Sequence, residues 1–115
     1  MIYEALDVVV VPFPFTDRKA SKRRPALVLS AASAFNTPSG HAVLAMVTSK
    51  KNPPWPLDVD ITDPQSAGLT APSVVRMKLF TLDRQLILRK AGALGAVDRG
   101  NVSAALEKLL GAGQP

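Results

Sequence analysis

The sequence contains no cysteine and only one histidine. Without cysteine the chain can form neither a disulfide nor a thiolate metal site. The histidine, His41, lies in the turn-forming cluster "FNTPSGH" at residues 35–41, which favours a solvent-facing position and gives a Ser-His-Asp or Cys-His arrangement little support. No group of His, Asp and Glu residues has the spacing of metal ligands, so we expect no metal site.

Long apolar runs and glycine-rich phosphate loops are also missing. The run "VVVVPFPF" at residues 8–15 is broken by prolines and is far shorter than the roughly 20 residues of a membrane-spanning helix. The N-terminal stretch "MIYEALD" carries acids where a secretion signal carries cations, which indicates a cytoplasmic protein without a membrane partner. The seven glycines are scattered and form no nucleotide-binding fingerprint, so we expect no cofactor.

Acidic residues are scarce relative to basic ones. Nine Asp and Glu stand against 14 Lys and Arg, which gives a formal net charge of +5 and a pI of about 10.0. This balance favours an anionic partner, although an ordinary basic surface explains the charge alone equally well. The 115 residues, 47% of them apolar, match one domain with its own core, so we expect residues 1–115 to form a single domain.

Most of the chain has the pattern of short strands. Some runs are β-branched and apolar throughout, and others alternate apolar with polar residues. The expected strands cover residues 7–13, 25–31, 42–49, 57–61, 73–82 and 85–94. Followed by a helix, they predict a compact, mostly antiparallel barrel or half-barrel with long loops.

The helix is predicted over residues 97–111. Asp98 can cap its start and Gly111 can close its end. Its apolar stripe is expected to consist of Val102, Leu106, Leu109 and Leu110.

Polar and basic side chains gather where the second and third strands would meet. Arg24 begins the second strand, while Thr48 and Ser49 end the third, so antiparallel pairing would bring them to one rim of the sheet. A guanidinium and a hydroxyl ringed by cations suit a phosphodiester, and Trp55 and Phe15 can stack on bases. A basic rim with a core-covering tryptophan explains the same residues equally well. The flanking loops supply the cations Arg18, Lys22, Arg23, Lys50 and Lys51.

Five stretches stand out along the chain: "DVVVVPFPFTD", "KRRPALVLS", "VLAMVTS", "GLTAPSVVRMKLFTLD" and "ALEKLL". Together they resemble the MazF/PemK family of toxin endoribonucleases from type II toxin–antitoxin systems, over nearly the whole chain from about Asp7 to Leu110. The Arg-Pro pair at the head of a strand is the most specific part of this resemblance. The resemblance implies an SH3-like small barrel with a C-terminal helix (a MazF/PemK/CcdB-like fold), a homodimer, and inhibition by an acidic antitoxin protein.

The same resemblance implies a reaction and the residues that perform it. Members of the family cleave single-stranded RNA, commonly mRNA, without a metal, through attack of the 2′-hydroxyl to give 2′,3′-cyclic phosphate and 5′-hydroxyl ends. Arg24 and Thr48 match the catalytic arginine and threonine, and Arg76 matches a third catalytic position. Lys78 stands where some relatives carry an aspartate, which leaves the general base open between Asp17 and the arginines. The expected RNA-binding residues are Phe15, Thr16, Asp17, Arg18, Lys22, Arg23, Ser49, Lys50, Lys51, Trp55 and Lys78.

Two other functions stay open at this point. The same barrel serves in a CcdB-like toxin that poisons DNA gyrase by protein contact, and that activity would not need Arg24 or Thr48. A degenerate family member would bind RNA or an antitoxin without cutting, and the lysine at position 78 is compatible with such a protein.

Overall fold

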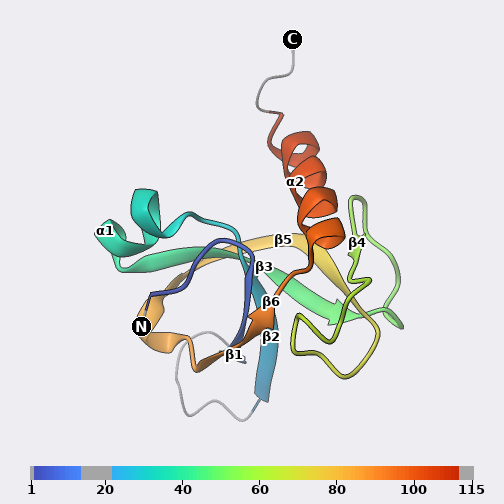
Figure 1. Cartoon of the computed structure of the whole chain (residues 1–115), viewed down its shortest axis with the longest axis horizontal. Coiled ribbons are helices and arrows are strands. Elements are labelled where there is room, and N and C mark those ends of the chain that lie inside the picture. Colours follow the sequence, from blue (N-terminus) through green and yellow to red (C-terminus); the bar gives the residue numbers. More distant parts are fainter. Residues whose placement is uncertain (1, 14–21, 112–115) are drawn as a thin grey trace.

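The computed structural model describes residues 2–13 and 22–111. Six strands form one antiparallel sheet in the order β4-β5-β3-β2-β1-β6, and helix α2 packs at one end of it (Figure 1). The strands are β1 (Asp7–Phe13), β2 (Lys22–Val28), β3 (His41–Ser49), β4 (Val59–Asp60), β5 (Ser73–Asp83) and β6 (Arg89–Ala93). The helical segments are the π-helical turn η1 (Ala32–Asn36), the short α1 (Thr37–Ser39), the 3-10 turn η2 (Arg84–Leu86) and α2 (Ala96–Leu110).

The predicted antiparallel half-barrel with a C-terminal helix is confirmed, and β1, β3 and β5 lie within one residue of their expected bounds. β2 begins earlier than expected, because Lys22 to Arg24 pair with Phe13 to Val11 across the β1–β2 hairpin. The expected strand at residues 57–61 shrinks to the two residues of β4, and the first part of the expected strand at 85–94 is η2. The turn cluster at 35–41 contains α1 and ends in Gly40, whose φ is 73°.

The sheet buries apolar side chains on both of its faces. One face, here called the helix face, carries Val8, Leu27, Ala45, Val47 and Val75, which pack with Val102 and Ala105 of α2. The other, the opposite face, carries Val9, Val11, Ala26, Val28 and Leu44, which pack with Tyr3, Leu82 and Ile87. Successive residues of a strand point to alternate faces, and directly paired residues share a face, so these clusters also fix where the polar residues point.

Helix α2 is anchored by an aspartate in its first turn. Gly95 is the N-cap residue, so the expectation that Asp98 caps the helix is wrong. Asp98 is instead buried and accepts hydrogen bonds from the backbone N–H and hydroxyl of Thr62, at 3.0 and 2.7 Å, and from the N–H of Asp63 at 3.1 Å. A carboxylate suits this helix end, where backbone N–H groups carry partial positive charge. It also ties the helix to the segment that follows β4.

The other end of α2 closes as expected but buries less than expected. Gly111 adopts a φ of 64° and donates its N–H to the carbonyl of Glu107, which is the predicted C-terminal cap. The predicted apolar stripe is half correct, because Val102 is buried and Leu106 packs against the core, whereas Leu109 and Leu110 are exposed. Within residues 2–13 and 22–111, no helix is long and apolar enough to cross a membrane.

The segment after β4 folds back over β6 and closes the half-barrel. The N–H of Ala93 donates to the carbonyl of Ser66 at 2.9 Å. A Cβ atom at Gly68 would lie 2.1 Å from the carbonyl oxygen of Ala91, and one at Gly92 would lie 2.3 Å from the carbonyl oxygen of Ser66. Glycine at these two positions therefore permits a backbone-to-backbone approach that any side chain would prevent.

Candidate functional site

The three expected catalytic residues share one face and one end of the sheet. β2 and β3 are antiparallel neighbours, as predicted, and their last pair at this end is Ala26 with Met46; Met46 also pairs with Arg76 of β5. Arg24 lies two residues before Ala26, and Thr48 two residues after Met46. Strand alternation therefore places Arg24, Thr48 and Arg76 on the opposite face.

Arg24 has an unsatisfied hydrogen-bond donor. Its guanidinium lies over the ring of Phe13, 5.0 Å from the ring centroid. Its Nε is buried and has no hydrogen-bond partner among the described residues. A buried donor without a partner costs about 1–3 kcal/mol, and more when it is charged. A bound anion would remove this cost.

Thr48 lies at the end of β3, where a turn orients its hydroxyl. Thr48 is half-buried, and its Oγ1 accepts a hydrogen bond from the amide Nδ2 of Asn52 at 2.6 Å. The hydroxyl keeps its own proton for a further acceptor. The neighbouring Ser49 is exposed, and its Oγ accepts the N–H of Lys51 at 3.2 Å. The turn thus presents one oriented hydroxyl beside the start of β2.

Arg76 is held by a carboxylate that the sequence reading did not single out. Its Nε and Nη2 donate to the two oxygens of Asp58 at 3.2 and 3.0 Å, and Nη2 also donates to the carbonyl of Pro53 at 2.8 Å. The two side chains are only 11% and 14% exposed. Hydrogen bonding to Arg76 lowers the pKa of Asp58 below its ordinary value, partial burial acts in the other direction, and the N–H of Trp55 adds to the lowering. The same pairing raises the pKa of Arg76.

Trp55 lies beside Arg76 and Asp58, within the site in which it is expected. Its ring lies 5.3 Å from the guanidinium carbon of Arg76 and 5.9 Å from Nζ of Lys78, measured to the ring centroid. The backbone N–H of Trp55 donates to Oδ2 of Asp58 at 2.9 Å, and 45% of the residue is exposed. The tryptophan is therefore an exposed aromatic platform, held in place by two cations and one carboxylate.

The remaining expected residues divide between the two faces. Arg23 pairs with Pro12 and points to the helix face, away from Arg24. Lys50 forms an exposed ion pair with Asp60 at 3.0 Å, and Lys22 and Lys51 are exposed. The cations expected to gather at one rim are therefore divided by β2, which begins at Lys22 and not at the expected Pro25. Four expected residues lie outside the described part of the chain: Phe15, Thr16, Asp17 and Arg18.

Asp58 was missed for a simple reason. The stretch "LDVDI" at residues 57–61 alternates apolar and acidic residues and is typical of a half-exposed strand. Its contact with Arg76 depends on how the loop before β4 folds back, which no local pattern encodes.

Within the described ranges, no group of three or more His, Asp or Glu residues is placed to hold a metal ion.

The comparison with known families gives one decisive match. The model for the PemK-like, MazF-like toxins of type II toxin–antitoxin systems matches residues 4–110. The chain belongs to this family. Arg24, Thr48 and Arg76 all lie within the matched range, so the site described above belongs to the family's own domain rather than to an added segment.

Solved structures of MazF-family toxins match this toxin along almost its full length. MazF in the MazE–MazF complex of Deinococcus radiodurans is 25% identical and has a TM-score of 0.73, with 96% of this chain and 97% of that chain covered. An endoribonuclease from a mycobacterial species, solved with its cognate antitoxin, is 17% identical, with a TM-score of 0.75 and coverage of 98% and 99%. The Mycobacterium tuberculosis toxin MazF-mt6 is 20% identical, with a TM-score of 0.69 and coverage of 91% and 96%. No curated protein matches the sequence significantly.

Proposed function

We propose that this toxin is a metal-independent, sequence-preferring endoribonuclease that cleaves single-stranded RNA, with mRNA as the natural target class. The observation that carries the proposal is the buried Nε of Arg24, which has no hydrogen-bond partner among the described residues and lies on the same face and end of the sheet as Thr48. A phosphodiester oxygen satisfies this donor, and the guanidinium can bind a second oxygen of the same phosphate. The family membership and the mycobacterial endoribonuclease with the same fold support this reading.

The reaction follows from the chemistry of RNA itself. The 2′-hydroxyl attacks the adjacent phosphorus, and the bond from phosphorus to the 5′ oxygen of the next nucleotide breaks. The 2′-hydroxyl gives up its proton to solvent water and the departing 5′ oxygen takes one up from solvent, so the products are a 2′,3′-cyclic phosphate and a 5′-hydroxyl. Arg24 stabilises the negative charge that develops on the phosphoryl oxygens, and Thr48 donates its hydroxyl proton to one of them.

Asp58 is a poor general base for this reaction. Its two oxygens are engaged by Arg76 and by the N–H of Trp55, and its lowered pKa makes it a weak proton acceptor. We infer that Asp58 is a positioning residue, which fixes Arg76 and through it the platform of Trp55. Arg76 then contributes positive potential beside the scissile phosphate, and Trp55 stacks on a base.

We also propose an acidic antitoxin as the protein partner and a homodimer as the functional form. The relatives from Deinococcus radiodurans and the mycobacterial species were solved with antitoxins. The net charge of +5 attracts an acidic chain, so the affinity should fall as salt is added. Exposed apolar side chains, including Leu79 and Val97, are available to a second copy. Sedimentation of the free toxin tests the dimer, and a salt-independent antitoxin complex would contradict the electrostatic picture.

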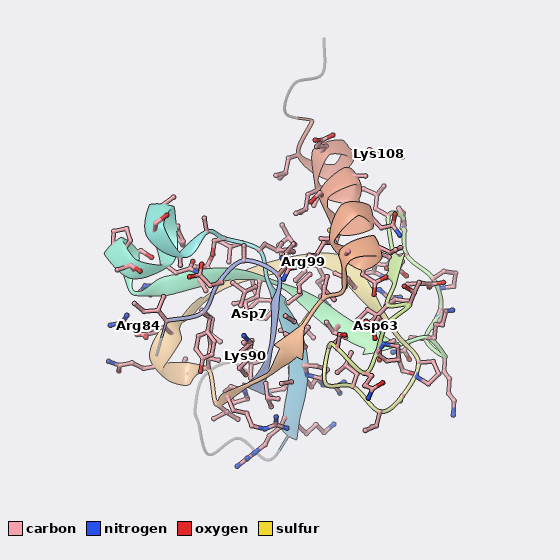
Figure 2. All side chains as sticks on the ribbon, viewed as in Figure 1. Asp7, Asp63, Arg84, Lys90, Arg99 and Lys108 are labelled. Carbon is pink, nitrogen blue, oxygen red and sulfur yellow. The ribbon has the colours of Figure 1, made fainter. Side chains whose placement is uncertain are left out.

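A cleavage assay on long single-stranded RNA in the presence of EDTA tests the activity. We expect discrete fragments with 5′-hydroxyl ends from the wild type, and a loss of about 10- to 100-fold in rate for Thr48→Ala, since a hydrogen bond to a charged group contributes about 1.5–3 kcal/mol. Arg84→Ala is the control: this exposed arginine lies beside the end of α1 (Figure 2), and only its backbone N–H, which the variant keeps, donates to the carbonyl of Gly40 there. Intact RNA with folded, antitoxin-free wild type would refute the enzyme and leave gyrase binding or RNA binding without cleavage.

A further inference from the structure

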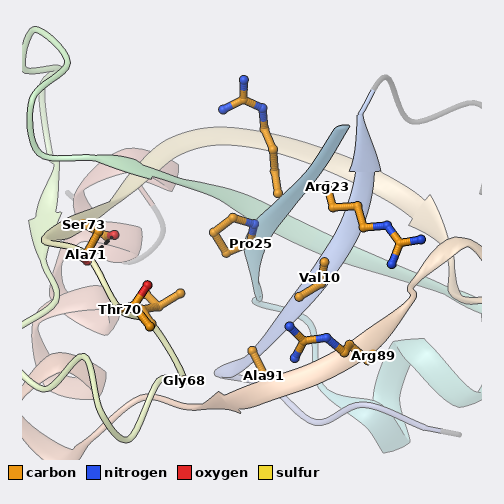
Figure 3. A pocket seen from close by; sticks show the side chains of 11 residues that line it. Val10, Arg23, Pro25, Gly68, Thr70, Ala71, Ser73, Arg89 and Ala91 are labelled. Atoms are coloured by element: carbon orange, nitrogen blue, oxygen red, sulfur yellow. Dashed lines mark hydrogen bonds between the residues drawn. The ribbon is translucent and has the colours of Figure 1, made fainter. Parts of the chain in front are cut away.

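A second basic pocket lies on the helix face, at the mouth of the half-barrel. Its volume is about 370 Å³. One wall comes from β2, β1 and β6, and the other from the segment at residues 68–73 (Figure 3). The lining residues are Val10, Arg23, Arg24, Pro25, Gly68, Leu69, Thr70, Ala71, Ser73, Arg89 and Ala91. Mouths of β-barrels are common ligand sites.

Strand pairing places two arginines on the face of the sheet that carries this pocket. Val10 in β1 pairs with Pro25 on one side and with Arg89 on the other, so these three residues share the helix face. Arg23 lies two residues before Pro25 and points the same way. Figure 3 shows Arg23 and Arg89 on one wall, with Thr70 and Ser73 across from them. Arg23 and Arg24 are adjacent in sequence, so their side chains lie on opposite faces of the sheet at the same end of β2.

Among the residues that the structure describes, none compensates the charge of this pocket. Its described lining includes three arginines and no acidic residue. Among residues 2–13 and 22–111, neither Arg23 nor Arg89 has an ion-pair or hydrogen-bond partner for its side chain, whereas Lys90, next to Arg89, pairs with Asp7 at 3.3 Å. Neighbouring guanidinium groups without a counter-charge repel each other and create a local positive potential. An anion bound between them would stabilise the arrangement.

The rest of the lining fits the ester of a phosphate. Val10, Pro25, Leu69 and Ala91 give the pocket apolar walls that suit a ribose or a base. The Thr70 hydroxyl lies on the loop wall, and Ser73 Oγ donates to the carbonyl of Ala71 at 2.9 Å, which leaves its lone pairs for a ligand hydroxyl. Arg24 also borders this pocket, although its side chain lies on the opposite face, so the pocket and the proposed cleavage site adjoin at the same end of β2.

We propose that this pocket binds a phosphate of the same RNA strand, at a nucleotide next to or near the cleaved bond. The inference rests on the proposed function, because it assigns a substrate subsite to the same enzyme. An RNA strand carries a charge at every nucleotide, so one phosphate can lie at Arg24 while a neighbouring one reaches the pocket at the same end of β2, and arginine forks match phosphate oxygens in pairs. An acidic peptide carries a carboxylate only where its sequence has Asp or Glu, so it would need a specific sequence to reach both arginines.

The test measures binding without cleavage. The probe is a fluorescein-labelled 2′-O-methyl RNA dodecamer pool of mixed sequence, which lacks the attacking hydroxyl, and its affinity is followed by fluorescence anisotropy over a range of salt concentrations. We expect Arg23→Ala and Arg89→Ala each to weaken binding about tenfold and to reduce the salt slope by about 0.7, the value for one phosphate contact on a single strand. Arg89→Lys should recover part of the affinity, because the charge stays and the fork is lost. Arg84→Ala is the matched control and should bind as the wild type does.

The outcomes separate this inference from the proposed function. If the wild type cleaves RNA but Arg89→Ala binds the dodecamer with unchanged affinity and salt slope, the subsite is refuted and the enzyme stands. If the wild type does not cleave but Arg89→Ala weakens binding, the enzyme is refuted and the RNA subsite stands. A pocket that binds inorganic phosphate or a polyglutamate peptide through Arg89, without any effect of Arg89→Ala on RNA, would also overturn the proposal. In the cleavage reaction, the loss in Arg89→Ala should fall mainly on KM rather than kcat.

Discussion

Arg24 and Arg76 lie on the same face of one sheet, yet their surroundings differ. Arg76 is shielded from solvent and bound through two hydrogen bonds to Asp58, and a third reaches the carbonyl of Pro53. Arg24 stacks on Phe13 and retains a buried Nε without a partner among the described residues. The satisfied arginine organises its neighbours, and the unsatisfied one is available to a ligand. Hydrogen-bond satisfaction therefore separates two roles that residue type alone cannot.

Of the substitutions that test this comparison, replacing Arg24 should lower the cleavage rate most. In the proposed reaction Arg24 donates to the developing charge, so Arg24→Ala should lower kcat on the order of 100- to 1,000-fold, as for other oxyanion donors. Single-turnover cleavage of a defined RNA, with circular dichroism as the folding control, measures this loss. Arg24→Lys should remain strongly impaired, because one ammonium cannot replace the fork. A variant with nearly wild-type kcat would remove Arg24 from the chemistry.

Breaking the pair between Arg76 and Asp58 should have an intermediate effect. Asp58→Asn keeps Arg76 but weakens its hydrogen bonds to residue 58. Because Trp55 is then held less firmly in place, we expect about a tenfold lower kcat/KM. The fluorescence of Trp55, the only tryptophan, should shift to longer wavelength as its ring is released, and the thermal midpoint should fall by several degrees. An Arg76→Gln variant that is impaired far more than Asp58→Asn would show that the charge of Arg76 matters beyond positioning.

The same pair predicts a pH dependence with a definite sign. The pKa of Asp58 lies below its ordinary value of 3.8 in the folded chain, so the pair stabilises the fold at any pH above that value. The stabilisation is lost as the pH falls through the lowered pKa, because protonation removes the partner of Arg76. An acid titration of the Trp55 fluorescence should show this transition in the wild type and lack it in Asp58→Asn. A transition above the ordinary pKa would contradict the assignment.

The exposed pair of Lys50 and Asp60 should give the smallest effect. Both side chains are more than half exposed, and exposed ion pairs contribute about 0–1 kcal/mol, screened further by salt. Asp60→Asn should therefore change the free energy of unfolding by less than about 1 kcal/mol in urea denaturation. A larger loss would mean that this pair, like that of Arg76, holds the loop in place.

The periodicity of apolar residues predicted the strands of this toxin, because strand formation there depends on local pattern. The alternating and β-branched runs of β1, β3 and β5 gave their bounds, and antiparallel pairing brought Arg24 and Thr48 to the same end of the sheet. The placement of Arg23 and Arg24 on opposite faces of the sheet was not predicted, because three consecutive cations before a proline are typical of a loop. Strand pairing with β1 overrides that local signal.

The remaining misses involve contacts between distant segments. Asp58 reaches Arg76 across 18 positions, and Asp98 reaches Thr62 across 36. Nothing in the sequence around Asp98 distinguishes a helix cap from a tether to another segment. Arg89 carries no local signal either, since its place in the basic pocket follows only from the order of β2, β1 and β6 in the sheet.

The two glycines at the seam between β6 and the segment that crosses it have a consequence for sequence variation. Alanine at Gly68 or Gly92 would collide with backbone atoms and lift that segment from the strand. The segment also carries the loop wall of the basic pocket, so even a single added methyl group would reshape the pocket without altering any arginine. A saturation library selected for growth inhibition should therefore tolerate few replacements at these glycines and many at the equally small but unconfined Gly100.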